Sequence, residues 1–320
     1  MNVVVRPYEE QDAEAWDTLV ANSWNGTFLH QRKFLSYHGT RFQDLSLVIE
    51  DKRGHIVGVF PAALHPTRES TVTSHPGLTY GGVVHEGGLR GALMIEALEY
   101  IAQMYQAMGL RVMQYKVVPY IYHYVPAGDD LYALFRLGAV LYRSDLSATI
   151  DLTSYQKWRK GRRSDLSKAR RSGVQVEINS SALEQFWPVL EENLATKHKV
   201  RPVHTLEEIM SLQNMFPEQI KCLVGKKKNE IVAGVVLFCT AMVTHLQYEG
   251  SSALGREVAA LTMVLDHTIA KSKEWGARYF DFGMSNEHEG RVLNEGLYQF
   301  KASFGAGGVV HEFYELSLGR

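Results

Sequence analysis

Two segments of the chain share one pattern of hydrophobic and polar positions. Residues 47–64 (LVIEDKRGHIVGVFPAAL) place apolar runs on both sides of a charged turn, and residues 222–239 (CLVGKKKNEIVAGVVLFC) repeat that arrangement. Short apolar runs around a polar turn are typical of a β-hairpin. In this alignment Ile56 corresponds to Ile231. Further correspondences follow in the same order along the chain, so the pattern indicates an internal duplication.

The segment after each hairpin predicts a further strand. Residues 71–84 and residues 242–252 both lead to an aromatic residue and a glycine, Tyr80-Gly81 in the first copy and Tyr248-Glu249-Gly250 in the second. Apolar residues at helical spacing follow in each copy. The helices expected from this spacing span residues 92–108 and 258–275, and each ends at a glycine, Gly109 or Gly276.

Each copy therefore predicts the order helix, strand, turn, strand, strand, helix, strand. The leading helices are expected at residues 9–20 and 183–197, and the closing strands at residues 110–115 and 278–282. This α/β unit, a mixed sheet with a helix that crosses back, resembles the acyl-CoA N-acyltransferase (GNAT) fold. We expect a tandem duplication of two such domains, at residues 1–150 and 151–320. A linker is expected near residues 142–152, and a last strand at residues 308–316.

Composition limits the kinds of partner. The 320 residues are 45% hydrophobic and 22% charged, which is ordinary for a soluble globular protein. The net charge is −1, so the whole-molecule field does not attract polyanions, and DNA is not expected as a partner. Binding of phosphate groups must rest on a local patch.

The first residues lack the features of a signal peptide, and no window approaches the ~18 apolar residues of a membrane span. We therefore expect a cytoplasmic protein without a membrane span. The two cysteines are too few for a disulfide framework. Neither H-E-x-x-H nor paired C-x-x-C spacing occurs, so no metal and no tightly bound cofactor are expected.

A local basic patch is present at residues 157–171, where eight of fifteen positions are Lys or Arg. On a helix, Arg159, Arg163 and Arg170 fall on roughly one face, with Arg171 beside it. Such a cluster suits a diphosphate or a tRNA backbone. A solvated helical face is the alternative interpretation.

Two segments resemble the Fem-type peptidoglycan-bridge aminoacyltransferases and the related FemAB-like acetyltransferases. The first is the basic segment at residues 159–174 (RKGRRSDLSKARRSGV), and the second joins residues 280–283 (FDFG) to residues 296–305 (GLYQFKASFG). The resemblance covers roughly residues 150–310. In the first half, residues 74–82 (SHPGLTYGG) resemble a stretch of these enzymes, and Tyr80 and Gly81 would line the acceptor site.

The resemblance implies transfer of an acyl or aminoacyl group to an amine. The acceptor would be a cell-envelope molecule, such as a nucleotide-linked cell-wall precursor or an amino sugar. The donor stays open between acyl-CoA and aminoacyl-tRNA, because the Q/R-x-x-G-x-G/A motif of simple GNAT enzymes is absent. In its place, residues 251–260 (SSALGREVAA) carry small residues and one glycine.

Acyl transfer requires stabilisation of a developing oxyanion. Lys301 is the candidate for that role, with Phe300 beside it to exclude water. The alternative is a lysine that extends from an amphipathic segment into solvent. As an exposed side chain, Lys301 is expected to tolerate replacement by alanine with a nearly unchanged melting temperature, although transfer is lost.

Tyr248 and Glu249 end a strand beside the expected cleft, where backbone groups would hold the donor. Glu249 or Asp281 is expected to accept the amine proton; alternatively, Asp281 caps a loop or pairs with an arginine. No G-x-S-x-G motif occurs, which favours direct attack in a ternary complex over an acyl-enzyme. The alternative of another class is a non-catalytic nucleotide- or tRNA-binding module on a degenerate GNAT scaffold.

Overall fold

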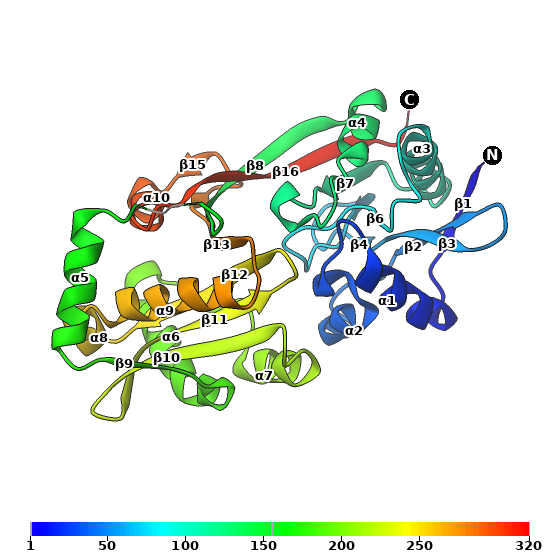
Figure 1. The fold of residues 1–320 in the computed structure, drawn as a ribbon. Helices are drawn as coiled ribbons and strands as arrows, with labels where there is room; N and C mark the ends of the chain where they lie inside the picture. The colour runs from blue at the N-terminus through cyan, green and yellow to red at the C-terminus, as the bar shows by residue number, and fades with distance from the viewer. Residues whose placement is uncertain (1, 155–156, 320) are drawn as a thin grey trace. The chain divides into compact units, whose positions relative to one another are not determined.

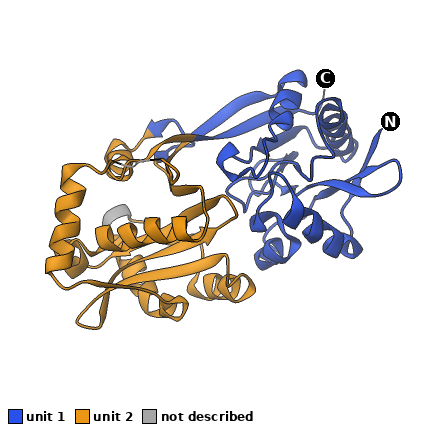
Figure 2. Ribbon diagram, viewed as in Figure 1, with its two compact units in different colours: residues 1–145, 286–292, 310–320 blue, residues 146–285, 293–309 orange. Residues whose placement is uncertain are grey.

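The structure is a computed structural model that describes residues 2–154 and 157–319. It divides into two compact units (Figure 2). Unit 1 comprises residues 1–145, 286–292 and 310–320, and unit 2 comprises residues 146–285 and 293–309. Both units include segments from the C-terminal half of the sequence. The expected boundary between two domains at residue 150 therefore stays a prediction.

Unit 1 contains the first predicted hairpin. Strands β2 (Leu47–Asp51) and β3 (Ile56–Phe60) pair antiparallel, as the turn between their apolar runs predicts. Strands β1 (Val3–Pro7) and β6 (Val84–His85) complete this sheet in the order β1-β2-β3-β6.

A second group of strands in unit 1 differs from the prediction. The single strand expected at residues 71–84 is wrong, because β5 ends at Thr73 (Thr71–Thr73) and a loop follows. His75 has a φ of 56° and precedes a proline, which removes the regular strand geometry. The amine of the half-buried Lys116 donates to three loop carbonyls, those of His75, Pro76 and Leu78, and stabilises the break.

The helices of unit 1 surround these strands. The leading helix begins later than expected, with a 3-10 turn at Glu10–Asp12 before α1 (Ala13–Asn22). Helix α3 (Ala92–Ala107) confirms the prediction and is followed by Gly109 at a φ of 84°. The shorter helices are η2 (Phe28–His30), α2 (Arg32–Leu35), η3 (Ser36–His38), η4 (Tyr120–Tyr122) and α4 (Asp129–Arg136).

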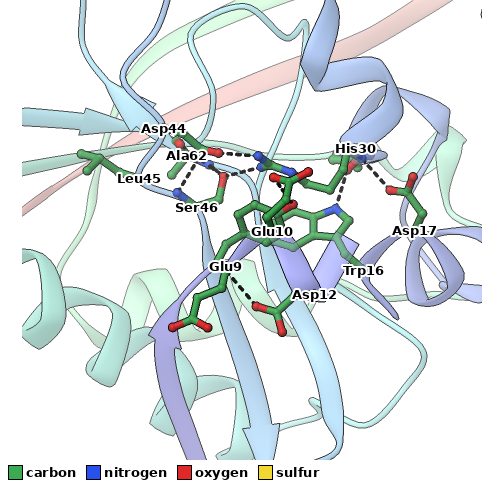
Figure 3. A network of polar contacts seen from close by, with 12 residues as sticks. Glu9, Glu10, Asp12, Trp16, Asp17, His30, Asp44, Leu45, Ser46 and Ala62 are labelled. Atoms are coloured by element: carbon green, nitrogen blue, oxygen red, sulfur yellow. Dashed lines mark hydrogen bonds and ion pairs between the residues drawn. The ribbon is translucent and has the colours of Figure 1, made fainter. Parts of the chain in front are cut away.

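Polar contacts anchor α1 to the following loop (Figure 3). The indole of the fully buried Trp16 donates to the carbonyl of His30 at 2.8 Å, and Asp17 accepts from the amide of Arg32. The Arg32 guanidinium in turn contacts Asp44 and Ser46. A core of α3 side chains against both groups of strands completes unit 1.

Unit 2 contains the second hairpin, β10 (Ile220–Lys227) with β11 (Glu230–Cys239), which confirms the prediction. Its strands follow the order β8-β13-β12-β11-β10-β9 (Figure 1). The linker expected at residues 142–152 is instead most of a long strand, β8 (Val140–Asp151), whose last residues pair with β13 (Tyr279–Met284). The remaining strands of unit 2 are β9 (Gln175–Ile178) and β12 (Val243–Ser251). A small pair before α10, β14 (Asn286–Glu287) and β15 (Val292–Leu293), lies in unit 1 except for Leu293.

Helices α6 and α9 pack on the sheet of unit 2, and both match predicted helices. The basic segment forms α5, which packs against α9. The bounds are α5 (Lys160–Arg171), η5 (Ser180–Ala182), α6 (Leu183–His198), α7 (Leu206–Met215), α8 (Ala253–Glu257), α9 (Ala260–Glu274) and α10 (Glu295–Ala302).

The two units repeat one strand arrangement. In unit 1, β7 (Val112–Lys116) lies parallel to β5 and antiparallel to the end of β16 (Gly307–Ser317). In unit 2, β13 lies parallel to β12 and antiparallel to the end of β8. Each post-helix strand therefore has one parallel and one antiparallel neighbour, which confirms the tandem GNAT-like duplication.

Candidate active site

The parallel pairing of β12 with β13 is short. It covers Val243–His245 against Tyr279–Asp281, and then both strands continue without pairing to each other. The antiparallel register of β12 with β11 shifts at the same level, so that Gln247 is an extra residue in β12. Such a bulge bends a strand away from its neighbour. The sheet therefore opens between β12 and β13 directly after the pair His245–Asp281.

Asp281 lies at this point with its side chain fully buried. Its carboxylate accepts hydrogen bonds from the Thr149 hydroxyl at 2.8 Å, the Gly283 amide at 3.3 Å and the Ser147 hydroxyl. The fourth donor is Nδ1 of His245 at 2.8 Å. A buried carboxylate is tolerated because such donors replace its lost water.

Gly283 lies next to Asp281, His245 and Lys301. Its φ of 77° fits a shift in the pairing of β13 with β8, and this conformation favours glycine. A Cβ atom at this position would lie 3.3 Å from Cε1 of His245. The Gly283 carbonyl accepts a hydrogen bond from Nζ of Lys301 at 2.9 Å.

Lys301 is 4% exposed, so the expectation of an exposed lysine is wrong. Helix α10 directs its amine to the end of β13, where Nζ also donates to the Met284 carbonyl at 2.7 Å. Burial lowers the pKa of Lys301 to about 8, while the carboxylates of Glu249 and Asp281 act in the opposite direction. The structure thus brings these three predicted residues into one electrostatic environment.

Phe300, the aromatic residue predicted to lie beside Lys301, is contacted by the basic helix α5. The half-buried Phe300 ring lies 5.4 Å from the ring of Phe304. The guanidinium of Arg162, a residue the sequence analysis did not select, lies 5.2 Å from the Phe300 ring centre. Arg159 donates to the side-chain oxygen of Gln299 at 2.8 Å. These contacts attach the N-terminal end of α5 to the helix that carries Lys301.

The other predicted cations differ in their surroundings. Arg163 and Arg171 are exposed on α5. Arg170 is also exposed and lies 3.5 Å from Asp266 of α9, an ion pair of little energetic weight at a surface.

Tyr248 faces the core of unit 2. Its hydroxyl lies 2.7 Å from Nδ1 of His204, and its ring packs edge-on against Trp187. Burial raises the pKa of Tyr248, so the phenol stays protonated at neutral pH. The Tyr248 side chain therefore packs within unit 2. Only the backbone of β12 borders the opening next to β13.

Tyr80 and Gly81 belong to unit 1 and are described there alone. The buried Tyr80 hydroxyl donates to the hydroxyl of Thr27 at 3.2 Å. The Gly81 amide donates to the Lys116 carbonyl, and a Cβ atom at Gly81 would lie 2.0 Å from the Ser74 carbonyl oxygen. Only glycine fits this position, so close packing accounts for Gly81 in the sequence Tyr80-Gly81-Gly82.

Sequence reasoning did not select His245. Nothing in the strand pattern of residues 242–252 indicates that His245 is the residue opposite Asp281, because the register of a parallel pair is set by the intervening helix. Ser147 and Thr149 were also missed, since their segment was interpreted as a linker. The one available signal was a histidine on the strand that precedes the DFG strand.

The comparisons with known proteins concern the domain and the fold. Residues 156–298 match the model of a family described as acetyltransferase (GNAT) domain. The matched segment contains the opening between β12 and β13. By this match the protein is an N-acyltransferase. No curated protein matches the sequence.

Solved structures match the GNAT fold over nearly the whole chain. The crystal structure of FemX has a TM-score of 0.70 at 13% identity, covering 98% of this chain and 97% of that one. The structure of L-PGS from Bacillus licheniformis has a TM-score of 0.63 at 13% identity, covering 98% and 94%. A tandem GNAT protein from the clavulanic acid biosynthesis pathway has a TM-score of 0.53 at 10% identity, covering 99% of both chains. At such low identities these likenesses show the fold.

No helix within residues 2–154 and 157–319 has the length and apolar character needed to cross a membrane. The same ranges contain no group of three or more His, Cys, Asp or Glu residues placed to hold a metal ion.

Proposed function

We propose that this N-acyltransferase moves an acyl or aminoacyl group from acyl-CoA or aminoacyl-tRNA to an amine of a cell-envelope-related acceptor. The observation that carries the proposal is the opening of the sheet between β12 and β13, with Lys301 beside it. The proposed reaction is direct attack of the amine on the donor carbonyl within a ternary complex.

The unpaired edge of β12 would hold the donor. Backbone groups after His245 are free of β13 and can form sheet-like hydrogen bonds to an extended donor arm. The donor carbonyl would then lie at the end of β13, near Lys301. An ammonium group has three N–H donors, and two of those of Lys301 are given to the Gly283 and Met284 carbonyls. The third would stabilise the oxyanion in a site with little water.

The basic helix α5 would hold the phosphate groups of the donor or of the acceptor. Arg159 and Arg162 fix its N-terminal end to α10, so its charges stand close to the helix of Lys301. Arg163, Arg170 and Arg171 supply exposed cations. A diphosphate from coenzyme A, from a nucleotide-linked precursor or from a tRNA backbone has the charge that this helix complements.

The acceptor proposal is an amine of a nucleotide-linked cell-wall precursor or an amino sugar, encountered in the cytoplasm. It is supported by the likeness of the fold to FemX and by the resemblance of residues 280–305 to the Fem-type enzymes. On the same basis, Tyr80 and Gly81 are proposed to line an acceptor site in unit 1.

A thermal-shift titration with acetyl-CoA, coenzyme A and a UDP-linked amino-sugar precursor tests the donor. A ligand that binds only the native state adds about 2.7 kcal/mol to the free energy of unfolding at a hundredfold excess over Kd. A shift with acetyl-CoA, followed by acetyl transfer to an amine, is expected for a coenzyme A-dependent enzyme. A shift with the precursor alone indicates an aminoacyl-tRNA donor. Binding without transfer from either donor favours the non-catalytic module instead.

Replacing Arg163 and Arg171 together with glutamine is expected to weaken donor binding about tenfold at low salt. Each exposed charge contact contributes up to about 1 kcal/mol, and 1.4 kcal/mol corresponds to a factor of ten in Kd. The difference from wild type should shrink as salt screens the contacts. The matched control removes Lys52 and Arg53, two exposed cations in the β2–β3 turn. Equal weakening in both double variants would show a general charge effect and contradict the role of α5.

A further inference from the structure

The proposed function leaves one step without an agent, namely removal of the proton from the attacking amine. His245 has the geometry for that step. Its Nδ1 atom lies 2.8 Å from Oδ2 of Asp281. The Asp281 carboxylate is fully buried and is itself held by the Ser147 and Thr149 hydroxyls. The imidazole of His245 therefore hydrogen-bonds a carboxylate whose position is fixed by other contacts.

This contact fixes the tautomer of the ring. An ionised carboxylate can only accept hydrogen bonds, so the proton of the neutral imidazole resides on Nδ1 and the lone pair on Nε2. Among the residues that the structure describes, no group hydrogen-bonds Nε2 of His245. The side chain is 15% exposed, so the ring borders solvent. A neutral imidazole with a free Nε2 is a competent general base.

The position in the sheet places that base beside the proposed reaction. His245 and Asp281 form the last pair before β12 and β13 separate. The Cε1 atom of His245 lies 3.3 Å from where a Cβ atom of Gly283 would be, and the Gly283 carbonyl accepts the hydrogen bond from the Lys301 amine. His245 and the proposed oxyanion donor Lys301 therefore both lie next to Gly283.

The two carboxylates named earlier are less suited to the role. Asp281 already accepts from four donors and has no exposed surface, so a proton arriving there would replace one of those hydrogen bonds. Glu249 has a buried Oε2 atom and acts electrostatically on Lys301, where its negative charge favours the ammonium form.

We infer that His245 is the general base of the acyl transfer, and that Asp281 is its positioning residue. The inference rests on the proposed function. The amine nitrogen attacks the donor carbonyl carbon and a C–N bond forms, while Nε2 of His245 takes the proton from that nitrogen. The C–S bond of a thioester, or the C–O bond of an aminoacyl ester, then breaks. Its electron pair leaves on sulfur or oxygen, which takes a proton from solvent, and the imidazolium returns its proton to solvent.

The test compares wild type with the His245→Gln variant, since glutamine can still donate to Asp281. We expect kcat for an amine acceptor to fall about 100- to 10,000-fold, with the KM for the donor and the donor-induced thermal shift unchanged. Hydroxylamine is largely uncharged near neutral pH and is a strong nucleophile, so it depends less on a base. Transfer to hydroxylamine should therefore fall far less than transfer to the amine.

The outcomes separate the inference from the proposed function. If wild-type protein transfers no acyl group, the proposed function fails. If wild type is active and His245→Gln keeps its kcat, or loses both acceptors equally, the inference is overturned. The Asp281→Asn variant should lower kcat with little change in KM, because an amide can hold the ring in the wrong tautomer. Should that variant fail to fold, Thr149→Val, which removes only one support of the carboxylate, is expected to give a smaller loss of the same kind.

Discussion

Replacing Lys301 with methionine is expected to lower kcat for acyl transfer about 100- to 1,000-fold, the typical effect of removing one oxyanion donor. Methionine keeps the length and the apolar stem of lysine, so the packing of α10 on the end of β13 should survive. The charge and both hydrogen bonds to the Gly283 and Met284 carbonyls are lost. Steady-state kinetics with saturating donor measures the effect.

The same variant has a pH-dependent effect on stability. The pKa of Lys301 is about 8 in the folded protein, against 10.5 as its usual value. Between these two pH values the unfolded chain binds more protons than the native one, so the free energy of unfolding of wild type rises with pH across that window. The methionine variant lacks this gain. The difference in the free energy of unfolding, wild type minus variant, should therefore grow by about 3 kcal/mol between pH 8 and pH 10.5 and stay level at lower pH.

Urea unfolding at several pH values provides the measurement, and Lys273→Met is the matched control. Lys273 is exposed in the last turn of α9. Its replacement should change neither kcat nor the pH dependence. A Lys301→Met variant with wild-type kcat would leave the lysine a structural role only. A flat stability difference across the window would contradict the burial of its charge.

The sequence predicted the fold well where a pattern is local. Hairpins and amphipathic helices depend on the spacing of apolar residues within one segment, and β2–β3, β10–β11, α3 and α9 all confirm the prediction. The strand expected at residues 71–84 failed because a side chain from elsewhere, Lys116, supplies hydrogen bonds to the loop. No local pattern contains that information.

The sequence predicted several residues of the candidate site but not their burial or their hydrogen-bond partners. The resemblance to Fem-type enzymes selected Lys301 and Asp281, yet it gave neither the burial of the lysine nor the partners of the carboxylate. The segment of β8 that supplies Ser147 and Thr149 is more than 130 residues away from Asp281 in sequence. Contacts of this range follow from the strand order β8-β13-β12, which hydrophobic periodicity does not specify.

Gly283 is the position where the backbone and the chemistry of the site meet, and Gly283→Ala is expected to disable transfer. Two separate costs arise. An alanine at a φ of 77° is strained by about 1–2 kcal/mol. Its Cβ would also lie 3.3 Å from Cε1 of His245, so the ring or the strand must shift by a few tenths of an ångström. A displaced ring loses its alignment with Asp281, and we expect kcat to fall about 100-fold, as misplacement of a catalytic group typically does.

Gly276→Ala separates these two costs. Gly276 follows α9 with a φ of 88°, and a Cβ atom there would meet nothing within 4 Å. Both alanine variants should therefore lose about 1–2 kcal/mol of the free energy of unfolding to backbone strain, because both force alanine into the left-handed region. Gly283→Ala should lose more than that, because its methyl group also presses on His245. Only Gly283→Ala should also lose activity, since only that methyl group presses on His245. Equal activity in the two variants would mean that the ring of His245 tolerates displacement, and it would argue against a general base at this position.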